Sequence, residues 1–381
     1  MFIKRFNLKD SIRNLEISDI DFTKLNVLVG TSGAGKTTIM TALFSITRIA
    51  DGESSPADSW SIEFIDNDNK EIIWSGRFSG EIDLDKEDND IAELIEEKII
   101  IDGIVVLEKK DGKTTLNNNP LPVLDKYKSN VYLLREDDEL MSIYQAMQSI
   151  IIVQNDSRAH VSEASIPIMS KKLPKKVGAF FKKNKDSSIN DYCSIYNDLD
   201  CRSKIFFAKQ YDKEKFDEFL FVYTSIFSNV DCINIKKYNG VKKQNGIQMQ
   251  HGFHLNLKLN DGTIVEQEDI SSGMFKTMML LSDLMFSSKF TVLLIDEVEN
   301  SLGVNCLPDI IQEIKSSDFQ CIISTHHPKI INDIPPKNWL IVSREKGNIS
   351  ASKSTEIINS TSHHDKFIQL INSCIFRGED Q

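Results

Sequence analysis

The residues best suited to chemistry form one glycine-rich stretch near the start of the chain. This stretch consists of Gly30, Thr31, Ser32, Gly33, Ala34, Gly35, Lys36 and Thr37, and Thr38 follows it. Glycines let the backbone curl so that successive N–H groups point inward at phosphate oxygens. The lysine can then reach the β- and γ-phosphates, and the hydroxyl of Thr37 can ligate Mg²⁺. The stretch therefore predicts a site at which residues 30–38 bind a nucleoside triphosphate.

The segments on both sides of this stretch support that interpretation. An apolar run from Leu25 to Val29 predicts a strand that leads into the loop, and a helix is expected from Thr37 through Ile46. Strand, loop and helix in this order are the context that a phosphate-binding motif requires. The helix N-terminus adds about half a positive charge at the phosphates. The alternative is a glycine-rich turn that binds nothing, and the complete motif with its flanks disfavours it.

Two adjacent carboxylates follow another short apolar run, which begins at Thr291. Such a run predicts a buried parallel strand with Asp296 and Glu297 at its C-terminal edge. Open α/β sheets place their ligands at that edge. We expect Asp296 to hold Mg²⁺ and Glu297 to align and polarise the attacking water.

A further strand is predicted from Gln320 to Thr325, and His326 follows it directly. A polar residue at such a strand end can sense the γ-phosphate. A histidine taken alone is more often an ordinary loop residue. Because this one follows the pair Asp296 and Glu297 in the chain, the sensing role is favoured.

Small hydroxylated residues also precede a helical pattern between the loop and the carboxylates. They are Ser271 and Ser272, and Gly273 comes next. Serines and a glycine at a helix start can bind an anion, or they can simply cap the helix. Taken singly, the segment favours the plain cap.

The order and spacing of these groups resemble the ABC-type ATPase head. The segment Ile270–Met274 resembles its LSGGQ signature, with Ser272 in place of the first glycine, and Ser271 lies 25 residues before Asp296. This variant is similar to the LSSG form in the ATPase domains of the overcoming-lysogenization-defect proteins and their AAA-type relatives. Gly303 stands where that group usually has a histidine, so no role is carried over to it. The resemblance covers roughly residues 1–60 and 250–345.

The resemblance implies a fold, an activity and an assembly. The fold would be α/β, an ABC-type head with a β-rich N-terminal subdomain and a helical insertion. The activity would be hydrolysis of ATP with Mg²⁺, with Lys36, Glu297 and His326 as catalytic residues. Such heads form head-to-tail homodimers or higher oligomers. ATP at the lysine of one subunit would be closed over by Ser271, Ser272 and Gly273 of the other, and monomers would hydrolyse it slowly.

Three regions are expected along the chain. Residues 1–137 would hold the phosphate-binding loop and a β-rich lobe, residues 138–228 a helical insertion, and residues 229–381 the rest of the head. Hairpin patterns around two turns, at about residues 66–70 and 111–112, predict the β-rich lobe. The segment 81–97 is acidic and is expected to be a solvated face.

Apolar spacing typical of helices predicts the insertion, beginning with a helical pattern from Met141 through Ile151. No heptad pattern runs for three or four repeats. The long coiled coil of the structural-maintenance-of-chromosomes ATPases is therefore not expected.

One segment of the insertion is strongly basic. Seven lysines lie between Lys171 and Lys185, beside Phe180 and Phe181. The segment could hold a nucleic-acid phosphate backbone or an acidic partner, or it could be an ordinary solvated surface. The whole chain carries a formal charge of −11, so non-specific nucleic-acid binding over its entire surface is not expected.

Composition excludes several classes of protein. The chain is 40% hydrophobic and 27% charged, and no apolar run approaches the ~18–20 residues that span a bilayer. Its charged start does not resemble a signal peptide, so a cytoplasmic protein is expected. Six scattered cysteines favour reduced thiols over a zinc site or disulfides. The trio His363, His364 and Asp365 favours a polar loop over a metal site, and no Toprim nuclease domain is expected after His326.

These features favour an ATP-binding and ATP-hydrolysing switch subunit that acts on a separate effector protein. The resemblance points to prokaryotic anti-phage defence, in which such ATPases hold or release a nuclease or toxin, as in PARIS, Septu and retron-linked systems. The first alternative is a DNA-repair or chromosome clamp whose ATP-closed dimer grips duplex DNA. A transporter's nucleotide-binding subunit is the second, and the long insertion disfavours it.

Overall fold

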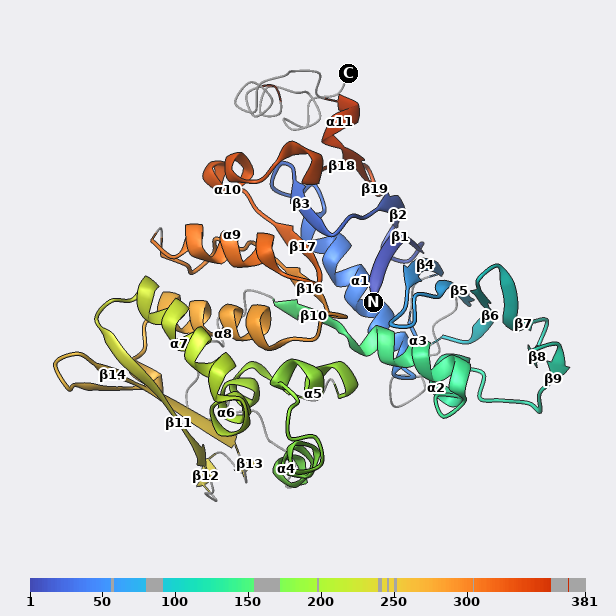
Figure 1. Cartoon of the computed structure of the whole chain (residues 1–381). Helices are drawn as coiled ribbons and strands as arrows, with labels where there is room; N and C mark the ends of the chain where they lie inside the picture. The colour runs from blue at the N-terminus through green and yellow to red at the C-terminus, as the bar shows by residue number, and fades with distance from the viewer. Residues whose placement is uncertain are drawn as a thin grey trace. The chain divides into compact units, whose positions relative to one another are not determined.

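The structure, a computed structural model, describes residues 1–55, 58–79, 92–153, 172–196, 199–238, 242–244, 247–249, 252–303, 305–357 and 369. The chain forms two compact units (Figure 1). The first comprises Met1–Gln154, Phe290–Val298 and Phe319–Gln381, and the second comprises Asn155–Lys289 and Glu299–Asp318. The predicted mixed α/β architecture is therefore present, in two units built from interleaved stretches of chain.

A large mixed sheet dominates the first unit. In spatial order its fourteen described strands are β10 (Ile150–Val153), β16 (Val292–Ile295), β17 (Gln320–Ser324), β3 (Leu25–Val29), β18 (Trp339–Glu345), β19 (Asn348–Lys353), β2 (Leu15–Asp21), β1 (Phe2–Asp10), β4 (Ser59–Ile65), β5 (Glu71–Phe78), β6 (Leu94–Ile101), β7 (Ile104–Lys110), β8 (Lys113–Leu116) and β9 (Asn119–Pro120). The five from β10 to β18 run parallel to one another. Antiparallel hairpins build the half from β1 to β9.

Burial explains why the two halves of the sheet differ in sequence. All four residues of β16 are buried, as in parallel strands covered on both faces. In β4 buried and half-buried residues alternate, which is typical of a strand with one face in the core. The hairpins predicted around residues 66–70 and 111–112 are confirmed as β4–β5 and β7–β8.

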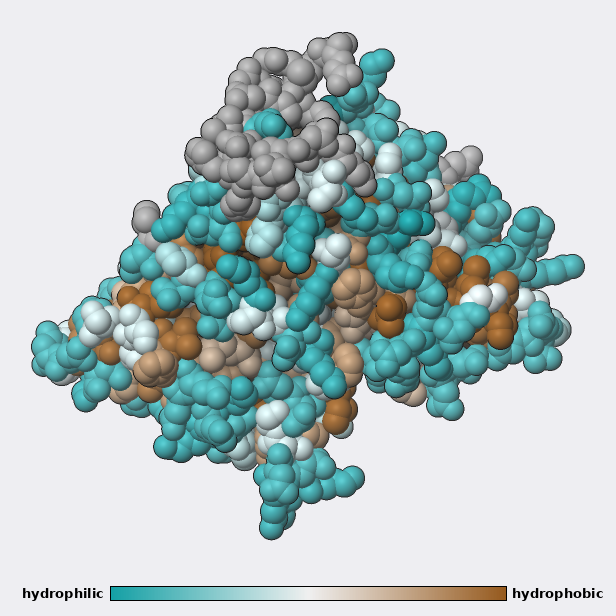
Figure 2. All heavy atoms as spheres, turned by 45° about the horizontal axis from the view of Figure 1, so that its top comes forward, coloured by the Kyte–Doolittle hydropathy of each residue, from teal (hydrophilic) through white to brown (hydrophobic). Residues whose placement is uncertain are grey.

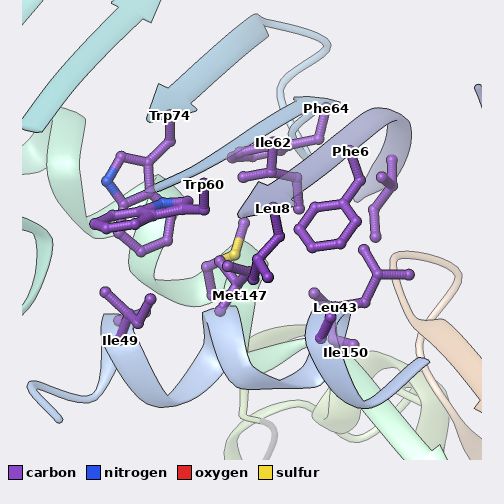
Figure 3. Close-up of a cluster of buried hydrophobic side chains, with 14 of the residues drawn as sticks. Phe6, Leu8, Leu43, Ile49, Trp60, Ile62, Phe64, Trp74, Met147 and Ile150 are labelled. Carbon is purple, nitrogen blue, oxygen red and sulfur yellow. The ribbon is translucent and has the colours of Figure 1, made fainter. Parts of the chain in front are cut away.

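Helices of the first unit cover the sheet and fix the glycine-rich loop. They are α1 (Lys36–Ala50), α2 (Asn130–Leu133), α3 (Asp138–Gln148), α10 (Pro328–Asp333) and α11 (Ser354–Ile357), with a 3₁₀ turn, η4 (Pro336–Asn338). Figure 3 shows Leu43 and Ile49 of α1 facing Leu8 of β1, Trp60 of β4 and Met147 of α3 in one buried cluster. Each such side chain contributes roughly 1.5–3 kcal/mol by burial. The helix that follows the loop is thus anchored along its length.

The predicted helical pattern from Met141 through Ile151 is wrong at its C-terminal end. The helix α3 stops at Gln148, and Ile150 and Ile151 begin β10, which pairs in parallel with β16. Four consecutive β-branched residues favour a strand. The N–H of Val292 donates to the carbonyl of Ser149, so pairing begins directly at the helix end.

The second unit contains the basic segment and the serine-rich helix start. Its helices are α4 (Leu173–Lys183), α5 (Ile189–Ile195), α6 (Cys201–Tyr211), α7 (Lys213–Ile226), α8 (Ser272–Phe286) and α9 (Leu307–Ser316), and a 3₁₀ turn, η3 (Gln267–Asp269), precedes α8. A three-stranded antiparallel sheet joins β11 (Val230–Tyr238), β14 (Gly252–Leu259) and β15 (Ile264–Glu266), and β12 (Lys242–Gln244) pairs with β13 (Ile247–Met249). The expected three-part division does not coincide with the two units, because β10 joins the first unit's sheet and α8 belongs to the second unit.

Other expectations concern the surface and the cysteines. On the face shown in Figure 2 hydrophilic residues predominate, and hydrophobic ones are exposed as separate areas. No helix in the described part of the chain is both long and apolar enough to cross a membrane. The five described cysteines are free thiols, as expected. Residues 80–91, Lys171, His363, His364, Asp365 and Cys374 lie outside the described residues.

Candidate nucleotide-binding site

The glycine-rich loop joins β3 to α1 in the first unit. Gly35 forms the N-cap of α1 with φ 103°, a left-handed conformation that side chains with a Cβ rarely adopt. A Cβ at this position would also come within 2.5 Å of the side chain of Ile349. Glycine is therefore required here, both for the turn and for the close approach of β19.

The start of α1 can accept an anion. Its N-cap residue is a glycine and has no side chain to bond the first N–H groups of the helix. The ammonium of Lys36 is buried and donates to the carbonyl oxygens of Gly30 at 2.9 Å and Thr31 at 3.0 Å. The lysine is thus folded against its own loop. Phosphate oxygens bound to the loop could take over these donated bonds.

Three side chains from three elements meet beside the loop. The hydroxyl of Thr37, on α1, donates to both carboxylate oxygens of Asp296 at 3.1 and 2.9 Å. The hydroxyl of Ser324, at the end of β17, donates to the same carboxylate at 2.7 Å. Because β17 lies between β16 and β3, these residues converge at the carboxyl ends of the parallel strands. The structure thus brings together Thr37 and Asp296, the two residues expected to hold Mg²⁺.

Glu297 directly follows this carboxylate in an unusual backbone conformation. Its φ of 44° is left-handed, which for a residue with a Cβ costs roughly 1–2 kcal/mol. Its N–H donates to the hydroxyl of Ser324 at 2.7 Å, and the N–H of Val298 donates to the Ser324 carbonyl at 3.1 Å. Strained backbone held by such contacts is typical of functional sites. The turn therefore holds Glu297 beside Asp296 at the edge of the sheet.

The two histidines after β17 have different surroundings. His326 is exposed and follows the buried Thr325. His327 caps α10, because its Nδ1 accepts from the N–H of Lys329 at 3.2 Å. The hydroxyl of Thr325 accepts from the N–H of His327 at 3.0 Å and fixes the chain there. His326 thus follows the strand that carries Ser324, and its sensing role stays a prediction.

The serine-rich residues lie in the second unit, at the start of α8. The hydroxyl of Ser271 accepts from the N–H of Met274 at 3.3 Å and caps this helix. Ser271 and Ser272 are exposed, and Gly273 is half-buried. A Cβ on Gly273 would come within 3.1 Å of the carbonyl oxygen of Ser301. The cap is therefore present, and both serines are exposed at a helix N-terminus.

One member of the site was not selected from the sequence. Ser324 contacts both acidic residues, yet the prediction at this strand end was the histidine two positions later. The available signal was a small hydroxylated residue ending a buried apolar strand. Only the strand order, with β17 between β3 and β16, gives that serine its place.

The residues present fit Mg²⁺ with a nucleotide. A threonine hydroxyl and a buried aspartate provide the hard oxygen ligands that Mg²⁺ prefers, and they already lie within 3.1 Å of each other. Mg²⁺ usually completes its shell with water and substrate phosphates. The described residues contain no group of three or more His, Cys, Asp or Glu that could hold a metal ion.

Comparison with known proteins agrees with this geometry. The model of a family described as "AAA domain, putative AbiEii toxin, Type IV TA system" matches residues 25–332. The structure is similar to an Smc head bound to the C-winged helix domain of ScpA, with a TM-score of 0.53 at 15% identity over 92% of this chain and 97% of that one. This likeness shows the fold, and the predicted ABC-type head is confirmed.

Two further solved structures are similar over most of their length. An Smc head domain with an extended coiled coil, bound to the C-terminal domain of ScpA from Pyrococcus furiosus, has a TM-score of 0.44 at 13% identity, over 98% of this chain and 100% of that one. The SMC head domain from Thermotoga maritima has a TM-score of 0.41 at 13% identity, over 93% and 99%. No curated protein matches the sequence significantly.

Proposed function

The chain belongs to the AAA-domain family whose model it matches, and on this premise we propose that it is an ATP-hydrolysing switch subunit. It would close into a dimer when it binds ATP and thereby control a separate effector protein. The meeting of Thr37, Asp296 and Ser324 beside the glycine-rich loop carries the enzymatic part of this proposal.

Each residue of the site has a chemical task in this proposal. The loop N–H groups and the ammonium of Lys36 bind the β- and γ-phosphates and offset their charge. Thr37 and Asp296 would hold Mg²⁺, which would supply positive charge to offset the negative charge that develops on the phosphates. Glu297 orients a water and accepts its proton as the water oxygen bonds to the γ-phosphorus. The bond to the bridging oxygen breaks, and ADP and phosphate are released, while His326 contacts the γ-phosphate.

The second half of the site would come from another copy of the chain. Ser271 and Ser272 are exposed at the N-terminus of α8, a 15-residue helix whose dipole favours an anion. In a two-fold dimer each such turn would close over the nucleotide in the other subunit's loop. ATP would then stabilise the closed dimer because it binds both subunits.

The family description supports a place in a toxin–antitoxin or defence system. It names a toxin and a type IV toxin–antitoxin system. We propose that the closed and open dimers differ in affinity for a toxin or nuclease of a prokaryotic anti-phage system. An ATP-driven clamp on duplex DNA is the second candidate, and the lysine-rich helix α4 favours it.

A trapping experiment tests the switch. We expect purified Glu297→Gln protein to bind ATP and form a stable dimer in light scattering, because the water is no longer activated. Wild type should dimerise transiently, and Lys36→Ala should stay monomeric with ATP. Products of neighbouring genes, added to each variant, should bind in a manner that depends on ATP. A Glu297→Gln protein that binds ATP and stays monomeric would refute the dimer, and a partner retained equally with and without ATP would refute the switch.

A further inference from the structure

Helix α4 is amphipathic, with exposed lysines on one side and buried apolar residues on the other. Since successive helical residues are rotated by about 100°, its lysines fall within an arc of about 120°. We call this set the lysine face; it consists of Lys172, Lys175, Lys176, Lys182 and Lys183, and all five are exposed. Val177 and Phe181 lie on the opposite arc and are buried. The lysines thus form one continuous surface of an amphipathic helix.

Aromatic contacts hold the helix on the second unit. The ring of Phe181 stacks on Tyr211 of α6, with centroids 4.8 Å apart and planes 8° from parallel. Phe180 meets Tyr192 of α5 edge-on at 5.2 Å. Gly178 leaves room for Tyr211, whose hydroxyl would lie 3.0 Å from a Cβ at that position. Each aromatic pair adds about 0.5–1.5 kcal/mol, so the lysine face is fixed to a packed scaffold.

Three lysines of this face have no carboxylate partner in the part of the chain that the structure describes. No acidic residue occurs between positions 172 and 185. Within the described chain, Lys175, Lys182 and Lys183 form no salt bridge with a carboxylate. Like charges on one helix face repel each other and destabilise the helix. A bound polyanion would relieve that repulsion.

Three other exposed lysines of the same unit are paired with carboxylates. Lys213 and Lys215 of α7 pair with Asp217 at 3.1 Å and with Glu218 at 2.8 Å. Lys258 of β14 pairs with an aspartate of β11 at 2.7 Å. The chain carries a formal net charge of −11, and the five exposed lysines of this face form a positive patch on it.

We infer that the lysine face binds the phosphate backbone of duplex nucleic acid. From Lys172 to Lys183 it extends about 16 Å along the helix axis, long enough to face several phosphates of one strand. Lysine binds phosphate as a point charge, whereas reading of bases relies on bidentate side chains such as arginine. Binding should therefore be independent of sequence.

The aromatic side chains favour a duplex over a single strand. Proteins that bind single strands stack successive bases on accessible rings. Here Phe181 and Tyr192 are buried in the packing of α4 against its neighbours. The faces of these two rings are not accessible to bases. Phe180 and Tyr196 are half-buried, and the ammonium of Lys176 lies 3.8 Å from the centroid of the Tyr196 ring and covers it. The surface therefore favours contacts to the backbone.

Charge reversal with a matched control tests this inference on the full chain without nucleotide. One variant carries Lys175→Glu, Lys182→Glu and Lys183→Glu, and the control carries Lys213→Glu, Lys215→Glu and Lys258→Glu, with the same change in net charge. Fluorescence anisotropy measures binding of a short labelled DNA duplex and of the matching single strand. Circular dichroism confirms that both variants are folded.

The expected result is a loss of duplex binding in the first variant alone. Three phosphate contacts contribute roughly −2.7 to the slope of the logarithm of the binding constant against the logarithm of the salt concentration. A four-fold rise in salt concentration should therefore weaken duplex binding by wild type about 40-fold more than residual duplex binding by the variant. Equal losses in both variants would show a mere net-charge effect and overturn the inference. Tighter binding of the single strand would also overturn it. Lysine-dependent binding of polyglutamate, without DNA binding, would indicate an acidic protein partner instead.

Because the assay contains no ATP, its outcome is separate from that of the switch. If the chain binds duplex DNA but its Glu297→Gln variant does not dimerise with ATP, this inference is supported and the proposed function is refuted. Duplex binding that also stimulates wild-type ATP hydrolysis would favour the clamp.

Discussion

A single hydroxyl links the two acidic residues of the candidate site. Ser324 donates its proton to the carboxylate of Asp296 and accepts the N–H of Glu297, each at 2.7 Å. The serine therefore holds both the carboxylate of Asp296, at the end of β16, and the left-handed backbone of Glu297 that follows it. Because both contacts come from one side chain, its loss should disturb the proposed metal ligand and the proposed water-activating residue together.

We predict that Ser324→Ala lowers ATP hydrolysis by about 10- to 100-fold. A hydrogen bond to a charged group contributes about 1.5–3 kcal/mol, and each 1.36 kcal/mol of lost transition-state stabilisation is tenfold in rate. The Mg²⁺ concentration at half-maximal rate should also rise. Both are measured by steady-state phosphate release. Ser343→Ala is the control, because it removes a part-buried hydroxyl of β18 whose hydrogen bond is to the hydroxyl of Ser350 on the neighbouring strand. Equal rates in wild type and Ser324→Ala would contradict this role.

Sequence predicts best where chemistry demands a residue type at a fixed spacing. The loop from Gly30 to Thr37 is recognisable because the left-handed N-cap needs glycine and the phosphates need a lysine. Asp296 is recognisable at the end of an apolar run. Ser324 is not, because serine ends many strands, and its partners lie 27 and 28 residues away in the chain. Its role follows from strand order, which local sequence does not contain.

At the level of elements, a buried ion pair ties the serine-rich helix to the insertion. The ammonium of Lys204, on α6, donates to Asp283 of α8 at 2.8 Å and to the hydroxyl of Ser287 at 2.9 Å. Burial alone would lower the pKa of Lys204, but the charge of Asp283, the hydrogen bond to it and the nearby thiols of Cys193 and Cys201 together raise that pKa. For the Cys201 thiol, which donates to the same carboxylate, burial has the opposite effect and raises the pKa, because it disfavours the charged thiolate. The lysine is therefore charged and the cysteine neutral at ordinary pH.

We predict that Lys204→Met destabilises the second unit by roughly 3–5 kcal/mol, because Asp283 is left buried without its partner. The double variant Lys204→Met with Asp283→Leu should recover most of that loss. Hydrogen exchange of α6 and α8 measures it. The three tryptophans, all buried in the first unit, provide an internal control. Their fluorescence reports unfolding of the first unit, and the denaturant concentration at its midpoint should not change. A double variant as unstable as the single one would contradict the pairing.

Element boundaries were predictable only where the signal is local. The helix α3 follows from its apolar spacing and its Asp137 cap. The strand β10 does not, because its partner β16 begins about 140 residues later and the apolar residues from Ile150 continue the helical spacing by coincidence. β10 is recruited by a sheet that distant segments build, so its place in the first unit is not contained in the local sequence.

For the whole molecule, the decisive feature is the distribution of functional groups over two units. The first unit carries the loop, Asp296 and Glu297, and the second carries the exposed Ser271 and Ser272. In the proposed dimer each nucleotide contacts the first unit of one copy and the second unit of the other. Mutations in the two units therefore damage different halves of a shared site.

Mixing two inactive variants should restore hydrolysis if the site is shared. Lys36→Ala lacks a working loop and should stay monomeric, and Ser272→Arg blocks the serine turn at an exposed position, so neither variant alone should be active. A heterodimer of the two contains one site in which an intact loop binds ATP and faces an intact turn. Because only one of its two sites works, we expect at most about half of wild-type activity when both are mixed in equal amounts. Lys36→Ala mixed with Glu297→Gln should recover nothing, because both changes fall in the same half of the site and no heterodimer contains an intact one. No recovery in the first mixture would mean that each chain hydrolyses ATP by itself. Recovery in that control would mean that Lys36 of one copy and Glu297 of the other act in the same site, which contradicts the proposed halves.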